Sequence, residues 1–125
     1  MRNGEVIAGT LVTVSKKNFE PLTARSFKTK IRGRVFKGFV VKKDGRYYAY
    51  QNLCQHLPIT LDLNDDDFFT HDKAHLQCHM HGAMYEIESG QCIAGPCQGT
   101  NLVALQVVEE ETRLVIRVPD PFIQS

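Results

Sequence analysis

Apolar and polar residues alternate along this chain over short stretches, as they do in half-buried strands, and no stretch keeps a helical period. The clearest runs, 35–42 and 46–51, are rich in Val, Phe and Tyr and are separated by Lys43-Asp44-Gly45. An Asp-Gly pair supplies the positive φ that a tight hairpin turn needs. The pattern therefore predicts a β-hairpin over residues 35–51.

Further strands are predicted on both sides of this hairpin. They are an edge strand over 5–14, short strands over 74–77 and 83–87, and a closing hairpin over 102–109 and 113–118 with an acidic turn at Glu110-Glu111-Thr112. Many short strands with closely spaced turn signals predict a small all-β domain, an antiparallel β-sandwich or barrel-like fold. A chain of 125 residues is long enough for one such domain.

Charge and hydropathy exclude several classes of partner. The formal net charge is +1, so the chain lacks the strongly basic field on which sequence-independent nucleic-acid binding relies. No apolar run approaches the roughly 20 residues that a bilayer span requires. The polar segment 1–5 also lacks the apolar core of a signal peptide. We therefore expect a cytoplasmic protein with no nucleic-acid or membrane partner.

Candidate chemistry is concentrated in two short motifs, Cys54-Gln55-His56 and Cys78-His79-Met80-His81. Thiolate and neutral imidazole are the ligands that combine most readily on borderline and soft transition metals. A structural zinc usually takes a Cys pair followed by a His pair, whereas each motif here mixes the two. The mixed order favours a [2Fe-2S] cluster with Cys on one iron and His on the other. A zinc-stabilised structural domain using the same four residues is the alternative.

Each motif is expected to begin where a strand ends, at Asn52-Leu53-Cys54 and at Cys78, which suits a metal site because its ligands need a rigid support. His71 and His75 lie between the motifs and are alternatives to His56 or His81. Four aspartates also occur there, at Asp62, Asp65, Asp66 and Asp67. They lack the Gly turn of a hard-cation loop, so we interpret them as a solvated loop.

Two further features allow more than one interpretation. Cys92 and Cys97 are either buried thiols, a disulfide or neighbours of the metal site. The segment 15–38 is rich in basic residues, namely Arg25, Lys28, Lys30, Arg32, Arg34 and Lys37. It is either the solvated face of a strand or loop, or a docking patch for an acidic redox partner.

The residues around both motifs resemble the Rieske-type ferredoxin family over about 35–118, most closely at 50–56, at 78–83 and in the segment from Ser89-Gly90 to Gly95-Pro96. The resemblance implies a single domain over 1–125 of the Rieske type, with a cluster-binding subdomain formed by loops at about 52–98. It also implies one [2Fe-2S] cluster per chain. In that family pattern Cys54 and Cys78 bind the inner iron, and His56 and His81 bind the outer, more exposed iron.

The implied function is one-electron transfer by a ferredoxin-like carrier between a reductase and an oxygenase or similar acceptor. No nucleophile with a matched base occurs beyond the metal ligands, so we expect an electron-transfer component without a substrate pocket and not an enzyme on its own. Alternatives are a small accessory subunit of a larger redox enzyme, similar to those of nitrite reductases, and the zinc domain.

The sequence departs from one branch of the family. Rieske proteins of quinol-oxidising complexes carry an extra Cys in each ligand loop, joined as a disulfide, and a Ser after the His-Gly pair. Here those positions are not Cys, and Ala83 replaces the Ser, while Tyr85 matches a second hydroxyl donor. Each lost donor to a cluster sulfur leaves the reduced centre less stabilised. We therefore expect a potential nearer about −150 mV than +300 mV.

Overall fold

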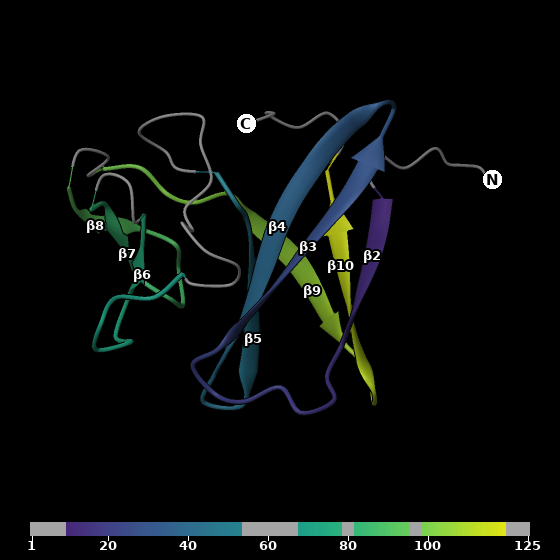
Figure 1. Cartoon of the computed structure of the whole chain (residues 1–125), viewed down its shortest axis with the longest axis horizontal. Helices are drawn as coiled ribbons and strands as arrows, with labels where there is room; N and C mark the ends of the chain where they lie inside the picture. The colour runs from purple at the N-terminus through teal and green to yellow at the C-terminus, as the bar shows by residue number, and fades with distance from the viewer. Residues whose placement is uncertain (1–9, 54–67, 79–81, 96–98, 120–125) are drawn as a thin grey trace.

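The computed structural model describes residues 10–53, 68–78, 82–95 and 99–119 (Figure 1). These residues form two antiparallel sheets, and no helix occurs among them. The six-stranded sheet has the order β2-β10-β9-β5-β4-β3, and the small sheet has the order β6-β7-β8. The strands are β2 (Thr10–Ser15), β3 (Ala24–Ile31), β4 (Arg34–Lys43), β5 (Arg46–Gln51), β6 (Leu76–Gln77), β7 (Met84–Tyr85), β8 (Cys92–Ala94), β9 (Ala104–Glu109) and β10 (Arg113–Val118).

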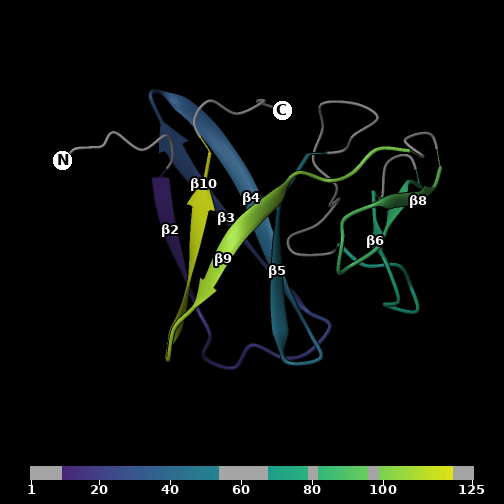
Figure 2. The same cartoon turned by 180° about the vertical axis from the view of Figure 1, so that it is seen from behind.

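The six-stranded sheet curls almost into a barrel, with the small sheet beside it (Figure 2). Its edge strands β2 and β3 are joined at one end by Arg25, whose guanidinium donates to the carbonyls of Ser15 (2.7 Å) and Lys17 (2.6 Å). Buried side chains fill the interior: Phe19, Ile31, Phe36, Val40, Ala49, Leu105, Leu114, Ile116 and Val118. The expected all-β, antiparallel fold is confirmed.

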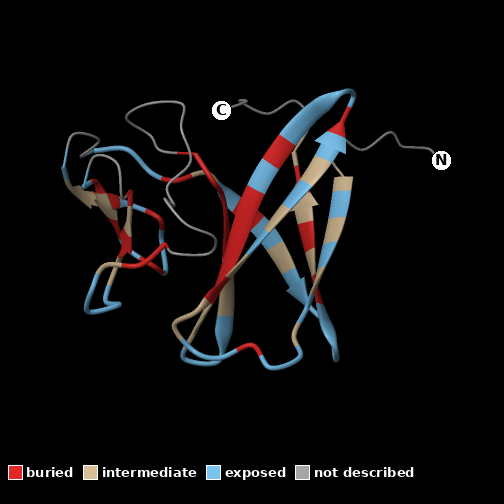
Figure 3. Cartoon of the chain, in the orientation of Figure 1, coloured by how far each residue is buried: buried red, intermediate tan, exposed pale blue. Residues whose placement is uncertain are grey.

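Strand β4 is buried on both faces from Gly38 to Val41, whereas Val35 and Lys37 nearer its start are exposed (Figure 3). Successive side chains of a strand point to opposite faces. Phe36 and Val40 therefore enter the barrel core, whereas Phe39 and Val41 face outward and join a second core with the small sheet. In this second core the ring of Phe39 stacks on Phe68, with 4.1 Å between the ring centroids. Burial on both faces explains the near-continuous apolar run in β4.

Specific polar contacts also fix the small sheet on the barrel. The hydroxyl of Tyr50 on β5 donates a 2.6 Å hydrogen bond to the carbonyl of Ile87, and burial raises the pKa of that phenol above its ordinary value. Gly90 lies against the same ring, so closely that a Cβ at this position would be only 2.7 Å from Cε1 of Tyr50. Lys43 and Glu88 form an exposed ion pair between the two sheets.

The predicted hairpins are confirmed. Asp44 and Gly45 both adopt positive φ (53° and 76°) between β4 and β5, and β9 and β10 pair across the acidic turn. Strands β6 and β7 are shorter than the predicted strands 74–77 and 83–87. β2 is an edge strand as expected, and it begins at Thr10; residues 5–9 of the predicted strand lie outside the described part.

Two elements had not been assigned from the sequence. The basic segment contains β3, which forms a hairpin with β4 through Arg32 and Gly33, both with positive φ (54° and 80°). β8 forms over residues for which no strand was predicted. Within the described ranges, no helix has the length and apolar character needed to cross a membrane.

Candidate metal centre

Cys78 is the one predicted ligand within the described residues, and it lies directly after β6 with 0% exposure. Its backbone N–H donates to the carbonyl of Ala83 (2.8 Å), and the N–H of Gly82 donates back to the carbonyl of Cys78 (2.7 Å). Gly82 has a φ of 76°, which glycine adopts at little cost. These bonds hold the two ends of the second motif together.

Gly95, directly after β8, packs closely against the backbone of Ala83 next to this motif. A Cβ at Gly95, whose φ is 97°, would lie only 2.8 Å from Cα of Ala83, so only glycine allows this approach of the two backbones. The resemblance to the Rieske family included Gly95 in one of its matching segments, but the contact with Ala83 was not predicted. The Gly-Pro pair at 95–96 was the available signal.

The backbone that leads to the first motif is equally constrained. The N–H of Gln51 donates to the carbonyl of Val103 (2.9 Å), and the N–H of Asn52 donates to the carbonyl of Lys37 (2.8 Å). Leu53 is buried, and its N–H donates to the carbonyl of Gln51 (2.9 Å). The prediction that a rigid strand leads into this motif is thus confirmed as far as Leu53.

His71 and His75 lie in a turn that joins Phe68 and Phe69 to β6. The N–H of Gln77 donates to the backbone carbonyl of Phe68, and the N–H of Thr70 donates to the backbone carbonyl of His75, each over 2.9 Å. Asp72 caps this turn by accepting from Thr70 Oγ1, which holds the pKa of that carboxyl below its ordinary value. Cys78 lies at the opposite end of this hairpin from the turn. The geometry gives no support to either histidine as a ligand.

Cys92 has a structural environment in the second core. It lies on β8 opposite Tyr85 and is buried, and its Sγ lies 3.3 Å from the carbonyl oxygen of Ala94, to which it donates a weak hydrogen bond. It is not joined to Cys78 by a disulfide. Cys97 lies outside the described residues, so a bridge between Cys92 and Cys97 stays an open alternative.

The surroundings of Cys78 are apolar. Ala83, Tyr85 and Ile87 alternate into the same core on and beside β7, and each is at most 1% exposed. A buried thiolate is costly unless a positive partner compensates its charge. A metal bound to Cys78 supplies that compensation, so the surroundings of this one described ligand position fit a thiolate-ligated iron. Cys54, His56 and His81 lie outside the described residues.

Solved structures share this fold. The ferredoxin of carbazole 1,9a-dioxygenase from Nocardioides aromaticivorans IC177 is similar with a TM-score of 0.63 and 22% identity, over 88% of this chain and 97% of that one. A chain from a complex of reduced oxygenase and oxidized ferredoxin in carbazole 1,9a-dioxygenase gives a TM-score of 0.65 and 20% identity, over 85% and 91%.

A longer protein contains the same fold as one part. The terminal oxygenase of carbazole 1,9a-dioxygenase from Novosphingobium sp. KA1 is similar with a TM-score of 0.62 and 21% identity, over 92% of this chain and 31% of that one. Comparison with curated protein sequences gives no match. The sequence profile of the Rieske [2Fe-2S] domain matches residues 12–116, which include both ligand motifs. The chain therefore belongs to the Rieske [2Fe-2S] domain family, and its cofactor is a [2Fe-2S] cluster.

Proposed function

We propose that this chain is a ferredoxin-type carrier that passes single electrons from a reductase to an oxygenase or a similar acceptor. The observation that carries the proposal is the family match over 12–116 combined with correspondence to nearly the whole of a ferredoxin, 97% of its length. The oxygenase chain, in contrast, is matched over 31% of its length.

We assign Cys54, His56, Cys78 and His81 as the ligands. The motif spacing and the buried, backbone-fixed position of Cys78 support this assignment. When bound, the [2Fe-2S] cluster supplies one-electron redox chemistry. Neutral His56 and His81 in place of two more thiolates reduce the negative charge that the low-dielectric surroundings must tolerate, which favours reduction.

The residues around Cys78 tune this site. Ala83 and Tyr85 are fully buried beside it, so water is kept from that side of the ligand. Ala83 has no hydroxyl to donate to a sulfur atom, which supports a potential in the lower part of the Rieske range. The proposal includes a cytoplasmic location, supported by the pairing of cysteine with histidine in both motifs.

The test is the visible absorption spectrum, together with the paramagnetic resonance signal after one-electron reduction. We expect a red-brown protein whose Rieske spectrum is lost or strongly altered in Cys54→Ser and Cys78→Ser. Cys92→Ser is the matched control, because this second buried cysteine lies in the same core and should leave the spectrum intact.

A normal Rieske spectrum in Cys78→Ser would contradict the ligand assignment, and a colourless protein with one zinc per chain would contradict the cofactor. Size-exclusion chromatography of the native protein separates a carrier from an accessory subunit. A stable complex of fixed stoichiometry with a larger redox enzyme would contradict the free carrier.

A further inference from the structure

The outward face of β3 and β4 is divided into a covered part and an exposed part. Paired residues of neighbouring strands share a face. The pair Ala24 and Val41 belongs to the core under the small sheet, as does Phe39 opposite Ser26. The next two pairs along the same face are Lys28 opposite Lys37 and Lys30 opposite Val35, and all four residues are exposed. We call these four residues the lysine face.

The lysine face lies beside the backbone that leads to the first ligand motif. The carbonyl of Lys37 accepts the N–H of Asn52 (2.8 Å), which places Lys37 next to a residue two positions before Cys54. The neighbouring residue pair on the same face is Ser26 and Phe39, and the ring of Phe39 stacks on Phe68, which precedes β6. Lys37 is thus adjacent to the segment that leads to the first ligand motif, and it lies two positions along β4 from Phe39, which contacts the segment before β6.

The charge of this face is unbalanced. No Asp or Glu occurs from Pro21 to Lys43. Lys28 stands directly opposite Lys37, an arrangement of like charges that destabilises a sheet. Among the described residues, none forms an ion pair with Lys28, Lys30 or Lys37. An arrangement that costs folding stability beside a redox site is expected where it serves recognition.

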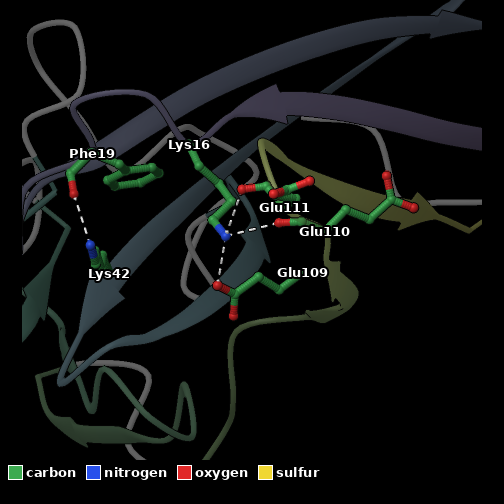
Figure 4. Close-up of polar contacts among 6 residues, drawn as sticks. All are labelled: Lys16, Phe19, Lys42, Glu109, Glu110 and Glu111. Atoms are coloured by element: carbon green, nitrogen blue, oxygen red, sulfur yellow. Dashed lines mark hydrogen bonds and ion pairs between the residues drawn. The ribbon is translucent and has the colours of Figure 1, made fainter.

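The other end of the barrel shows how this chain balances a lysine when no partner is needed. Nζ of Lys16 lies 2.8 Å from a carboxylate oxygen of Glu109 and donates to the carbonyl of Glu110 over 2.8 Å (Figure 4). Lys42 there donates to the carbonyl of Phe19 over 3.1 Å. The lysine face has no such acceptors among the described residues.

We propose that the lysine face docks an acidic surface of the redox-partner protein and so brings that partner to the ligand loops. This inference rests on the proposed function and adds the electrostatic character of the partner. Positive potential near an electron-exit site raises the encounter rate with a negatively charged reactant, and this effect falls as salt screens it. Val35, at 38% exposure, adds an apolar contact within the charged surface.

The test uses two small oxidants of opposite charge on the reduced holoprotein, followed by stopped-flow absorbance. The trianion hexacyanoferrate(III) takes one electron and becomes hexacyanoferrate(II), and the trication tris(1,10-phenanthroline)cobalt(III) likewise becomes cobalt(II). We expect Lys28→Glu/Lys37→Glu to slow the oxidation of the reduced protein by hexacyanoferrate(III) roughly tenfold at low salt. The cobalt reaction should become faster, and both effects should disappear at high salt.

The matched control is Lys17→Glu/Arg46→Glu, which changes the net charge by the same amount at exposed positions on the opposite end of the barrel. It should change either rate less than about twofold, because exposed charges more than roughly 10 Å apart are screened. Equal slowing in both double variants would show an effect of net charge and overturn the lysine face, and so would unchanged rates in the first variant. Midpoint potentials of all variants verify that the driving force is unchanged.

Elution from a sulfonate cation-exchange column gives a second measurement that does not depend on a reducible cluster. The variant of the lysine face should elute at clearly lower salt than its control, and equal elution would overturn the proposal. Tight binding of a double-stranded DNA fragment by the wild type at physiological salt would overturn it in favour of a nucleic-acid surface. A protein without a [2Fe-2S] spectrum would contradict the proposed function, while the column would still decide on the lysine face.

Discussion

The phenol of Tyr50 reaches from the barrel into the small sheet and donates a 2.6 Å hydrogen bond to the main-chain carbonyl of Ile87. The ring itself is 2% exposed and packs 5.9 Å from the ring of Phe39, measured between centroids. One side chain thus links the strand that leads to the first ligand motif with the segment after the second. We infer that the hydroxyl helps to fix the relative position of the two motifs.

Tyr50→Phe should lower the free energy of unfolding by about 1–2 kcal/mol, because the buried carbonyl of Ile87 loses its donor. Urea denaturation measures the change. Tyr48→Phe is the control: this half-buried residue packs on the same core, and its loss should stay within about 0.5 kcal/mol. Equal losses in both variants would show that the hydrogen bond contributes little.

The same hydroxyl should make stability sensitive to alkaline pH. Burial raises the pKa of Tyr50 above the ordinary tyrosine value, so the folded protein keeps a proton that the unfolded chain loses near pH of about 10. The folded state then binds more protons, and stability must fall as the pH rises through this range. Denaturation between about pH 8 and 11 should show a steeper loss in the wild type than in Tyr50→Phe. Parallel pH profiles would contradict this coupling.

Gly95→Ala should weaken the cluster site. The new Cβ would lie 2.8 Å from Cα of Ala83, and we expect a cost of about 1–3 kcal/mol from this overlap in addition to backbone strain. Gly99→Ala isolates the strain, since its φ of 95° nearly equals the 97° of Gly95 and its Cβ would meet nothing within 4 Å. Iron content per chain and thermal stability should both fall further in Gly95→Ala. Identical behaviour of the two variants would exclude a role for the contact with Ala83.

Sequence reasoning succeeded where the signal was local. Asp44-Gly45 between two aromatic and β-branched runs specified the β4–β5 hairpin, since only a turn with positive φ connects such strands so tightly. It left β3 undecided between strand and loop, because two of its outward positions are lysines and the apolar alternation is reduced to Phe27 and Ile31. The pairing of β5 with β9 left no local signal either, because strands far apart in sequence meet only through tertiary packing.

In the candidate site, too, local sequence signals were readable and contacts set by tertiary packing were not. The Cys and His spacing identified the family and predicts the ligand set, because metal coordination demands particular residue types at close intervals. The positions of its supports were not readable from the sequence. The contact of Gly95 with Ala83 and the bond from Tyr50 to Ile87 depend on how the small sheet lies on the barrel. Such contacts follow from packing in three dimensions and leave no fixed spacing along the chain.

Lys28→Glu should stabilise the fold, because it replaces repulsion from Lys37 across the two strands by attraction. We expect a gain of about 0.2–1 kcal/mol, measured by urea denaturation at low salt. Lys37→Glu should give a similar gain, whereas the double variant restores like charges and should lose it. Additive effects of the two substitutions on the free energy of unfolding would show that the two lysines do not interact electrostatically.

Glu88→Gln should show a pH-dependent loss of stability. The ammonium group of Lys43 holds the pKa of Glu88 below its ordinary value, so the pair stabilises the fold above the unfolded glutamate pKa of about 4.3. This contribution is lost as the pH falls through the lower pKa of the folded state. The wild type should thus exceed the variant near neutral pH, and the two should converge in acid. The difference should be small and should shrink with added salt, since both groups are exposed. A difference that persists in acid would assign the effect to packing of the side chain instead of its charge.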